Sequence, residues 1–188
     1  MSAIAQLGAL TGGYVVDAAR TRIGFVARHT MSTRVRGRFE EYEGGATLNG
    51  EEPERSSARM TIHATSLTTG NPQRDELLRT SFLDAGHHPT LDFTSTGVRR
   101  VDDTHYKVSG DLTIRGVTRR ITLDAELADA GVDMTEDPAD AHGDFRVSVT
   151  GGVTVNRNDW EVNWNSVTSV LVAPKVRLEF DVTLIRLS

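Results

Sequence analysis

The chain has 188 residues, 38% of them hydrophobic, with a formal net charge of −5 and no cysteine. This length supports a single domain with a substantial core, and the acidic balance argues against the broad positive surface that nucleic acid binding requires. The lack of cysteine excludes disulfides and thiolate metal sites, and no stretch approaches the roughly 20 apolar residues of a membrane-spanning helix.

The amino-terminal segment, residues 1–12, has no basic stretch, and its short apolar run is broken by Gln6 and Gly8. A secretory signal peptide requires a basic start followed by a continuous apolar core. We therefore expect a flexible tail at residues 1–12, a single domain over residues 13–188 and a cytoplasmic location.

Most of the remaining chain predicts β-strands, because apolar and polar residues alternate over short runs. The clearest runs cover residues 23–29, 34–39, 58–64, 91–95, 106–114, 121–127, 145–155 and 176–184. A period of two places one face of each strand in a core and the other in water, which is typical of antiparallel sheets. About eight such strands favour an all-β fold closed into a barrel, since closure removes exposed strand edges.

Turn signals separate these strands. Val101–Thr104 has the composition of a hairpin tip, and Gly116 can adopt the positive φ of a tight turn. Glu43–Gly45 is expected to break another strand pair. Residues 129–144 are acidic, so we expect an exposed loop there, and their acidic residues lack the spacing of a calcium-binding EF-hand.

One short helix interrupts the strand-rich pattern at residues 72–81, near one end of the barrel. Asn71 is a suitable N-cap and Pro72 suits a first helical turn, while Leu77, Leu78 and Phe82 share helical spacing. A helix this short must be held by packing.

Arg74 and Asp75 lie at the start of this helix. Asp75 suits the positive end of the helix dipole, and Arg74 can pair with a carboxylate or extend over the end of the barrel. Two interpretations are open: a clamp that fixes the helix, which we favour, and a polar contact to a bound ligand.

The interior of an eight-stranded barrel is just wide enough to be filled by its own side chains or to hold one small ligand. Small residues occupy many inward positions, namely Ala27, Gly37, Ala58, Ala64, Ser95, Gly110, Ala125 and Gly151. Close-packed interiors do not tolerate so much empty space, so this pattern favours a hollow, apolar interior. The alternative is that large neighbouring side chains fill the gaps.

Motifs for catalysis or metal binding are missing from the sequence. There is no GxSxG, GxGxxG, P-loop or HExxH motif, and the histidines lack zinc-ligand spacing. His29 lies in phase with Ile23 and Phe25 and should point inward, either as a hydrogen-bonded core residue or as a contact to a ligand headgroup. We therefore expect no catalytic residues, no metal and no cofactor.

Segments along nearly the whole chain, from Tyr14 to Leu187, resemble the YceI-like, polyisoprenoid-binding family. They follow that family's order: Tyr14–Asp17, Ile23–Phe25 leading to His29, Gly37–Phe39, Ser66–Asn71, Arg74–Asp75, Ser81–Asp84, His88–Thr96, Gly110–Thr118 and Val155–Arg157. The resemblance implies an elongated, lipocalin-like antiparallel barrel whose apolar tunnel holds a long isoprenoid chain, of the quinone or prenyl phosphate type. It implies no catalytic residues.

The chain departs from this family pattern in three places. Glu161 replaces a glycine at the end of the run Asn156–Glu161, the signal peptide of exported members is missing, and the segment 129–144 is unusually acidic. The first departure is expected to reshape one loop, and the second argues against an exported role.

Pattern and resemblance together predict a non-catalytic protein that binds, and carries or stores, a long-chain isoprenoid or related lipid. The expected ligand-binding residues are Phe25, His29, Phe39, Met60, Ile62, Arg74, Leu77, Leu78, Phe82, Phe93, Leu112, Phe145 and Phe180. Two alternatives are an enzyme acting on a hydrophobic substrate inside the barrel, with His29 as its evident acid–base candidate, and a filled barrel that serves in protein interaction or stress response. We expect no nucleic acid partner and no transmembrane segment, and the choice between a monomer and a homodimer is open.

Overall fold

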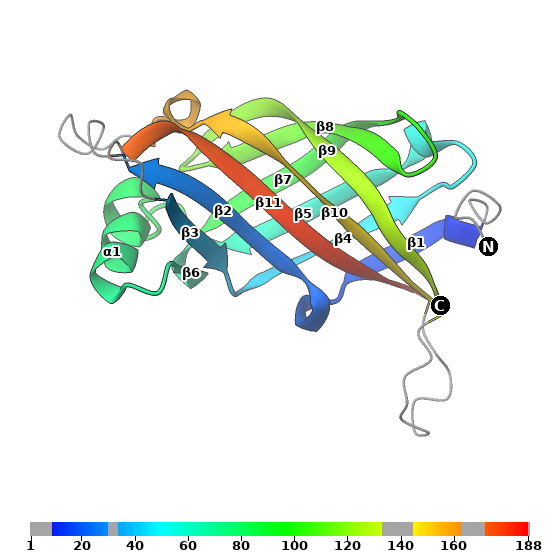
Figure 1. Ribbon diagram of the computed structural model, residues 1–188, viewed down its shortest axis with the longest axis horizontal. Coiled ribbons are helices and arrows are strands. Elements are labelled where there is room, and N and C mark those ends of the chain that lie inside the picture. Colours follow the sequence, from blue (N-terminus) through cyan, green and yellow to red (C-terminus); the bar gives the residue numbers. More distant parts are fainter. Residues whose placement is uncertain (1–8, 30–33, 133–144, 163–171, 188) are drawn as a thin grey trace, which may run out of the picture.

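The computed structural model describes residues 9–29, 34–132, 145–162 and 172–187, and most of their regular structure is strand (Figure 1). The strands are β1 (Gly12–Val16), β2 (Arg22–His29), β3 (Arg34–Phe39), β4 (Tyr42–Leu48), β5 (Ser57–His63), β6 (Leu67–Thr68), β7 (Thr90–Arg100), β8 (His105–Ile114), β9 (Val117–Val132), β10 (Phe145–Asn156) and β11 (Val172–Arg186). The helical segments are η2 (Ala18–Arg20), η3 (Pro53–Arg55), η4 (Ala64–Ser66), α1 (Pro72–Leu77), η5 (Leu78–Phe82) and η7 (Arg157–Trp160).

The strands close into an antiparallel barrel. β1, β4, β5, β7, β8, β9, β10 and β11 are hydrogen-bonded neighbours in that order, and β1 pairs with β11 to complete the ring. At this closure Tyr14 lies opposite Arg186 and Val16 lies opposite Leu184. The closed eight-stranded barrel with one short helix near one end, expected from the alternation and the resemblance, is confirmed.

Three further strands lengthen the barrel wall at the end where α1 lies (Figure 1). β2, β3 and β6 continue the sheet from β11. β2 pairs with the amino-terminal part of β11, from His29 opposite Val172 to Arg22 opposite Asp181, whereas β1 pairs with its carboxyl-terminal part. β1 and β2 thus follow the same long strand, with η2 between them, and the barrel is elongated as a result.

The glycines of Glu43–Gly45 do not break a strand pair, because all three residues lie inside β4. A Cβ on Gly45 would lie 2.6 Å from the backbone oxygen of Tyr14, and one on Gly44 would overlap the backbone oxygen of Arg59. Glycine in a strand often marks such a close approach of a neighbouring backbone. The expectation of a turn here was wrong because composition alone does not separate these two uses of glycine.

The turns expected at Val101–Thr104 and at Gly116 are confirmed. The first links β7 to β8, and the second links β8 to β9 with a φ of 75° at Gly116. Of the acidic segment expected to form a loop, residues 129–132 belong to β9, and residues 133–144 lie outside the described residues.

The expected amino-terminal tail is only partly described, since residues 1–8 lie outside the described residues. Leu10 is buried at 7% exposure, and the Tyr14 hydroxyl donates a hydrogen bond to its carbonyl oxygen at 2.8 Å. The described part of this segment therefore packs against the barrel.

The helix expected at residues 72–81 is confirmed, and its carboxyl-terminal half is wider than an α-helix. The Asn71 side chain caps α1 by accepting a hydrogen bond from the Arg74 backbone N–H at 3.1 Å. The helix continues from Leu77 into η5, a π-helical turn that ends at Phe82. Phe82 is only 4% exposed, so the helix is held by packing into the core.

Asp75 fixes this helix to the preceding loop. Its buried carboxylate accepts hydrogen bonds from the Thr69 backbone N–H at 2.8 Å, from the Thr69 hydroxyl at 2.5 Å and from the Thr68 hydroxyl at 3.2 Å. Arg74 Nε donates to the same Thr69 hydroxyl at 2.8 Å, and Arg79 Nε donates to the Leu67 carbonyl at 2.9 Å. These are the contacts of a structural clamp.

Replacing Asp75 with alanine is expected to lower the free energy of unfolding by about 1.5–3 kcal/mol, because the half-buried donors of Thr69 and Thr68 lose a charged acceptor. Urea denaturation at pH 7 measures this loss. Glu76→Ala, an exposed change one residue away, is the matched control and should cost less than about 0.5 kcal/mol.

The clamp also predicts an acid dependence of stability. Burial raises the pKa of Asp75, but the hydrogen bonds from Thr69 and Thr68 and the charge of Arg79 outweigh burial and hold this pKa below its ordinary value. A carboxyl whose pKa falls on folding stabilises the native state above its unfolded pKa of about 3.9, and this stabilisation is lost as pH falls through the folded pKa. The native protein should therefore lose more stability than Asp75→Asn between pH 5 and about pH 2; parallel losses would contradict the clamp.

Candidate functional site

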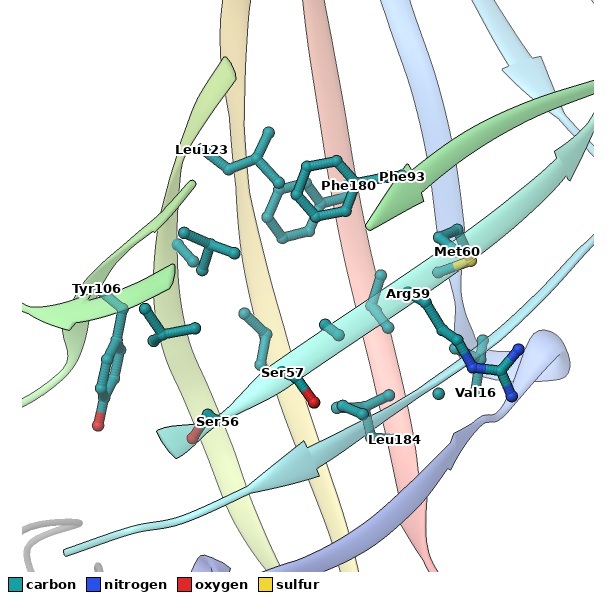
Figure 2. A pocket seen from close by; sticks show the side chains of 18 of the residues that line it. Val16, Ser56, Ser57, Arg59, Met60, Phe93, Tyr106, Leu123, Phe180 and Leu184 are labelled. Carbon is teal, nitrogen blue, oxygen red and sulfur yellow. The ribbon is translucent and has the colours of Figure 1, made fainter. Parts of the chain in front are cut away.

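A cavity of about 280 Å³ lies inside the barrel, and every strand of the closed ring contributes to its lining (Figure 2). Its walls are mostly aliphatic and aromatic. In Figure 2 the side chains of Phe93, Leu123 and Phe180 extend into this space from β7, β9 and β11. This volume is just below the range of roughly 300–1,000 Å³ that is typical of small-molecule pockets.

Six of the residues expected to bind ligand line this cavity. They are Phe39, Met60, Ile62, Phe93, Leu112 and Phe180. All six lie on the inward phase of their strands, so the period-two alternation places them there.

Two other expected aromatic residues have different surroundings. The Phe25 ring packs against Phe39, with ring centroids 6.0 Å apart. The Phe145 ring lies under the Arg186 guanidinium, whose central carbon is 4.3 Å from the ring centroid. Neither ring is part of the cavity lining.

The expected residues of the helix also lie outside the lining. Phe82 and Leu78 pack in the core cluster at the helix end, whereas Leu77 is 41% exposed. Arg74 belongs to the clamp around Thr69. His29 ends β2, but its side chain lies outside the described residues, so its expected contact to a headgroup stays a prediction.

Not all small inward residues leave empty space. A Cβ on Gly110 would lie 2.5 Å from Cζ of Phe93, and one on Gly37 would overlap the Phe25 ring. These two glycines are therefore covered by aromatic rings, as the filled alternative requires. Ala58 and Ala125, by contrast, line the cavity and contribute to its volume.

Several lining residues were not among the expected ligand-binding set. The aliphatic ones include Leu91, Leu123, Leu127, Val147, Val149 and Leu184. Their inward phase is visible in the sequence, so the alternation alone could have found them. The polar ones, Asn49, Ser56, Ser57 and Tyr106, belong to no motif that a single sequence reveals.

A packed apolar cluster at the helix end of the barrel includes Ala64, Leu67, Phe82 and Trp160. Trp160 is 2% exposed, and its Nε1–H donates to the Leu112 carbonyl oxygen at 2.8 Å. The indole thus ties η7 to β8.

Glu161, which stands where the family pattern has glycine, follows Trp160 with φ of 60° and ψ of 28°. A left-handed conformation costs a residue with a Cβ about 1–2 kcal/mol relative to glycine. Glu161→Gly is therefore expected to raise the free energy of unfolding by about 1 kcal/mol in urea denaturation. Asp159→Gly, an exposed helical control in η7, should instead lower it by about 0.5–1 kcal/mol; a loss of stability in both variants would contradict strain at Glu161.

The opposite end of the cavity is polar. The loop between β4 and β5, residues 49–56, lies at the end of the barrel opposite to α1 (Figure 1). Asn49, Ser56, Ser57 and Tyr106 line the cavity there, and we call this set the polar end. Tyr106 also packs against the apolar cluster around Leu10 and Tyr14.

Charged residues in the lining keep their side chains on the outer face. Arg59 and Glu179 are the charged lining residues, and both are exposed. Glu179 pairs with Arg36 at 3.7 Å outside the barrel. Among the described residues, no group of three or more His, Asp or Glu side chains is placed to hold a metal ion.

This geometry defines a class of protein: an elongated, lipocalin-like antiparallel barrel with an apolar internal cavity. The chain belongs to the YceI-like domain family, which matches residues 14–184. The resemblance noted in the sequence is thereby confirmed. Within the described residues, no helix is long and apolar enough to cross a membrane.

Relatives and solved structures agree with this assignment. A UPF0312 protein of Pectobacterium carotovorum is 31% identical over 141 residues, which cover 74% of this chain and 69% of that protein. Protein YceI of Escherichia coli O157:H7 is 34% identical over 112 residues, 59% of this chain and 58% of that protein.

The fold of BcnA from Burkholderia cenocepacia is similar, with a TM-score of 0.78 at 21% identity, covering 89% of this chain and 98% of that one. A polyisoprenoid binding domain from Saccharophagus degradans is similar with a TM-score of 0.68 at 17% identity, covering 93% of this chain and 98% of that one.

Proposed function

We propose that this protein binds a long apolar lipid of the isoprenoid type inside the barrel and carries or stores it without catalysing a reaction. The observation that carries the proposal is the apolar cavity of about 280 Å³, lined from every strand of the ring. Burial of apolar surface is worth roughly 25 cal/mol per Å² before the costs of ordering, so an apolar chain gains free energy in this space. Membership of the YceI-like family and the fold similarity to a polyisoprenoid binding domain support the same class of ligand.

The character of the lining favours binding over catalysis. General acid–base chemistry needs a positioned pair of titratable groups. Among the residues whose side chains the structure describes, the lining contains no histidine, and its charged members, Arg59 and Glu179, have exposed side chains. His87 and His105 are paired with Asp84 and Asp102, each at 2.8 Å, in exposed turns.

Native mass spectrometry of the purified protein, before and after delipidation, tests the proposal. We expect a mass shift of one apolar molecule per chain that disappears on delipidation, and organic extracts that contain a prenyl lipid. Delipidated protein should then bind a fluorescent prenyl probe saturably. An extract without lipid, together with no saturable probe binding, would contradict the proposed function.

A further inference from the structure

We infer that the polar end of the cavity selects lipids with an uncharged, hydrogen-bonding oxygen headgroup and excludes prenyl phosphates, with the Tyr106 hydroxyl as the donor to that headgroup. This inference rests on the proposed function. It names the chemical class of the bound lipid and the residues that determine it.

The polar groups gather at one end of an otherwise apolar lining. Figure 2 shows the hydroxyl groups of Ser56, Ser57 and Tyr106 on the same side of the lining, away from the rings of Phe93 and Phe180. An amphipathic molecule in the cavity gains most when its apolar chain lies along the rings and its polar group reaches these hydroxyls.

Part of this polar set is committed to the loop between β4 and β5. Ser56 Oγ accepts a hydrogen bond from the Asn49 backbone N–H at 2.9 Å. Asn49 Oδ1 accepts from the backbone N–H groups of Glu51 and Glu52 at 3.1 and 2.9 Å. These hydrogen bonds fix the shape of the loop. Ser56 Oγ and Asn49 Oδ1 already accept hydrogen bonds from the loop backbone.

The hydroxyl of Tyr106 is different, because it has no hydrogen-bond partner within the described residues. Tyr106 is half-buried in the lining, and burial raises the pKa of its phenol, so the hydroxyl keeps its proton as a donor. This hydroxyl is not among the fully buried unpaired atoms of the described residues, so water reaches it in the empty barrel, and a lipid that displaces this water must supply the hydrogen bond in its place. A carbonyl or hydroxyl oxygen on the lipid would supply this bond, and the exposed Ser57 lies at the same end.

The charges around this end disfavour an anion. Glu51, Glu52 and Glu54 are exposed in the loop, and the one cation between them and β5, Arg55, is paired with Glu52. A phosphate taken into the cavity would lose its hydration. Arg59, the cation of the described lining, has an exposed side chain, and Arg100, whose charge acts on the Tyr106 phenol, is paired with Asp103. The phosphate would therefore remain without a cation of its own, and burying an unpaired charge is expensive. The acidic loop would also repel it on approach.

Two cations near the helix, Arg79 and Arg115, are each hydrogen-bonded to a backbone carbonyl. Arg79 donates to the Leu67 carbonyl at 2.9 Å, and Arg115 donates to the Glu161 carbonyl at 3.1 Å. Neither lines the cavity, and the packed cluster around Phe82 and Trp160 occupies that end of the barrel.

Three probes with related chains test the headgroup: farnesol, farnesyl monophosphate and squalene, which has no headgroup. Each is titrated into the delipidated full-length protein and followed by displacement of the fluorescent prenyl probe. We expect farnesyl monophosphate to bind at least about tenfold more weakly than farnesol, because its charge finds no partner. Tyr106→Phe should weaken the binding of farnesol about two- to tenfold and leave the affinity for squalene unchanged, since only the hydrogen bond is removed.

The acidic loop is tested separately with Glu51→Gln/Glu54→Gln. At low salt, this variant should bring the affinity for farnesyl monophosphate closer to the affinity for farnesol. Added salt should make the effect of the substitutions smaller. Glu40→Gln/Glu76→Gln makes the same change in net charge at exposed positions outside the polar end and should leave the difference unchanged.

The outcomes separate the inference from the proposed function. Equal affinity of farnesol and farnesyl monophosphate in the native protein would overturn the headgroup selection while the lipid-binding function stands. Farnesol affinity that is unchanged in Tyr106→Phe would overturn the role of Tyr106. Failure of all three probes and of the fluorescent probe to bind would overturn the proposed function, and the inference with it.

Discussion

Replacing Ala125 with phenylalanine is expected to lower the affinity for prenyl probes at least about tenfold, which corresponds to about 1.4 kcal/mol. Ala125 is 6% exposed and lines the cavity from β9, between Leu123 and Leu127. The added ring would occupy space that the lipid chain needs, and it would cover apolar wall that the lipid would otherwise bury. Displacement of a fluorescent prenyl probe measures the loss.

The matched control is Ala128→Phe, the same change on the same strand at an exposed position. It should leave the affinity for the probe unchanged. Overpacking of an interior costs about 1–3 kcal/mol, so thermal denaturation of both variants checks that the barrel remains folded. Full probe affinity in a folded Ala125→Phe variant would mean that the ligand lies elsewhere.

The second large effect concerns the packed apolar cluster at the helix end. Trp160→Ala is expected to lower the free energy of unfolding by about 3–5 kcal/mol, because it empties a fully packed site and leaves the Leu112 carbonyl without its donor. Urea denaturation measures the change.

Trp160→Phe separates the two contributions, since it keeps most of the apolar contact and removes the N–H. Its cost should be about 1–3 kcal/mol. A Trp160→Ala variant that loses less than about 1 kcal/mol would show that the cluster around Phe82 can collapse into the space.

The general architecture could be predicted from sequence because a period-two pattern depends only on which face of a strand is buried. The inward phase of Ile62, Phe93 and Leu112 follows from that pattern, and these residues do line the cavity. Pairing between distant segments leaves no such local signal. Two such features are the pairing of β1 with β11 and the position of η2 between β1 and β2, which both pair with β11. A single-sequence pattern contains neither of them.

The site was harder to predict than the fold, because inward phase does not say what an inward side chain contacts. Phe25 points inward but covers Gly37, and Phe145 is shielded by Arg186. Selecting bulky aromatic residues also passed over Leu123 and Ala125, which line the cavity. The partnerless hydroxyl of Tyr106 becomes evident only when its neighbours are placed around it.

The closure of the ring has a consequence for when the interior can be filled. It joins residues 14–16 to residues 184–186, near opposite ends of the described chain. Contacts of such large sequence separation form late, because a long loop must close before they stabilise anything. During synthesis β11 is the last of these strands to leave the ribosome, and until then the interior has no complete wall. Under the proposed function, an apolar guest could be enclosed only after this strand has been made, so we expect loading to follow translation.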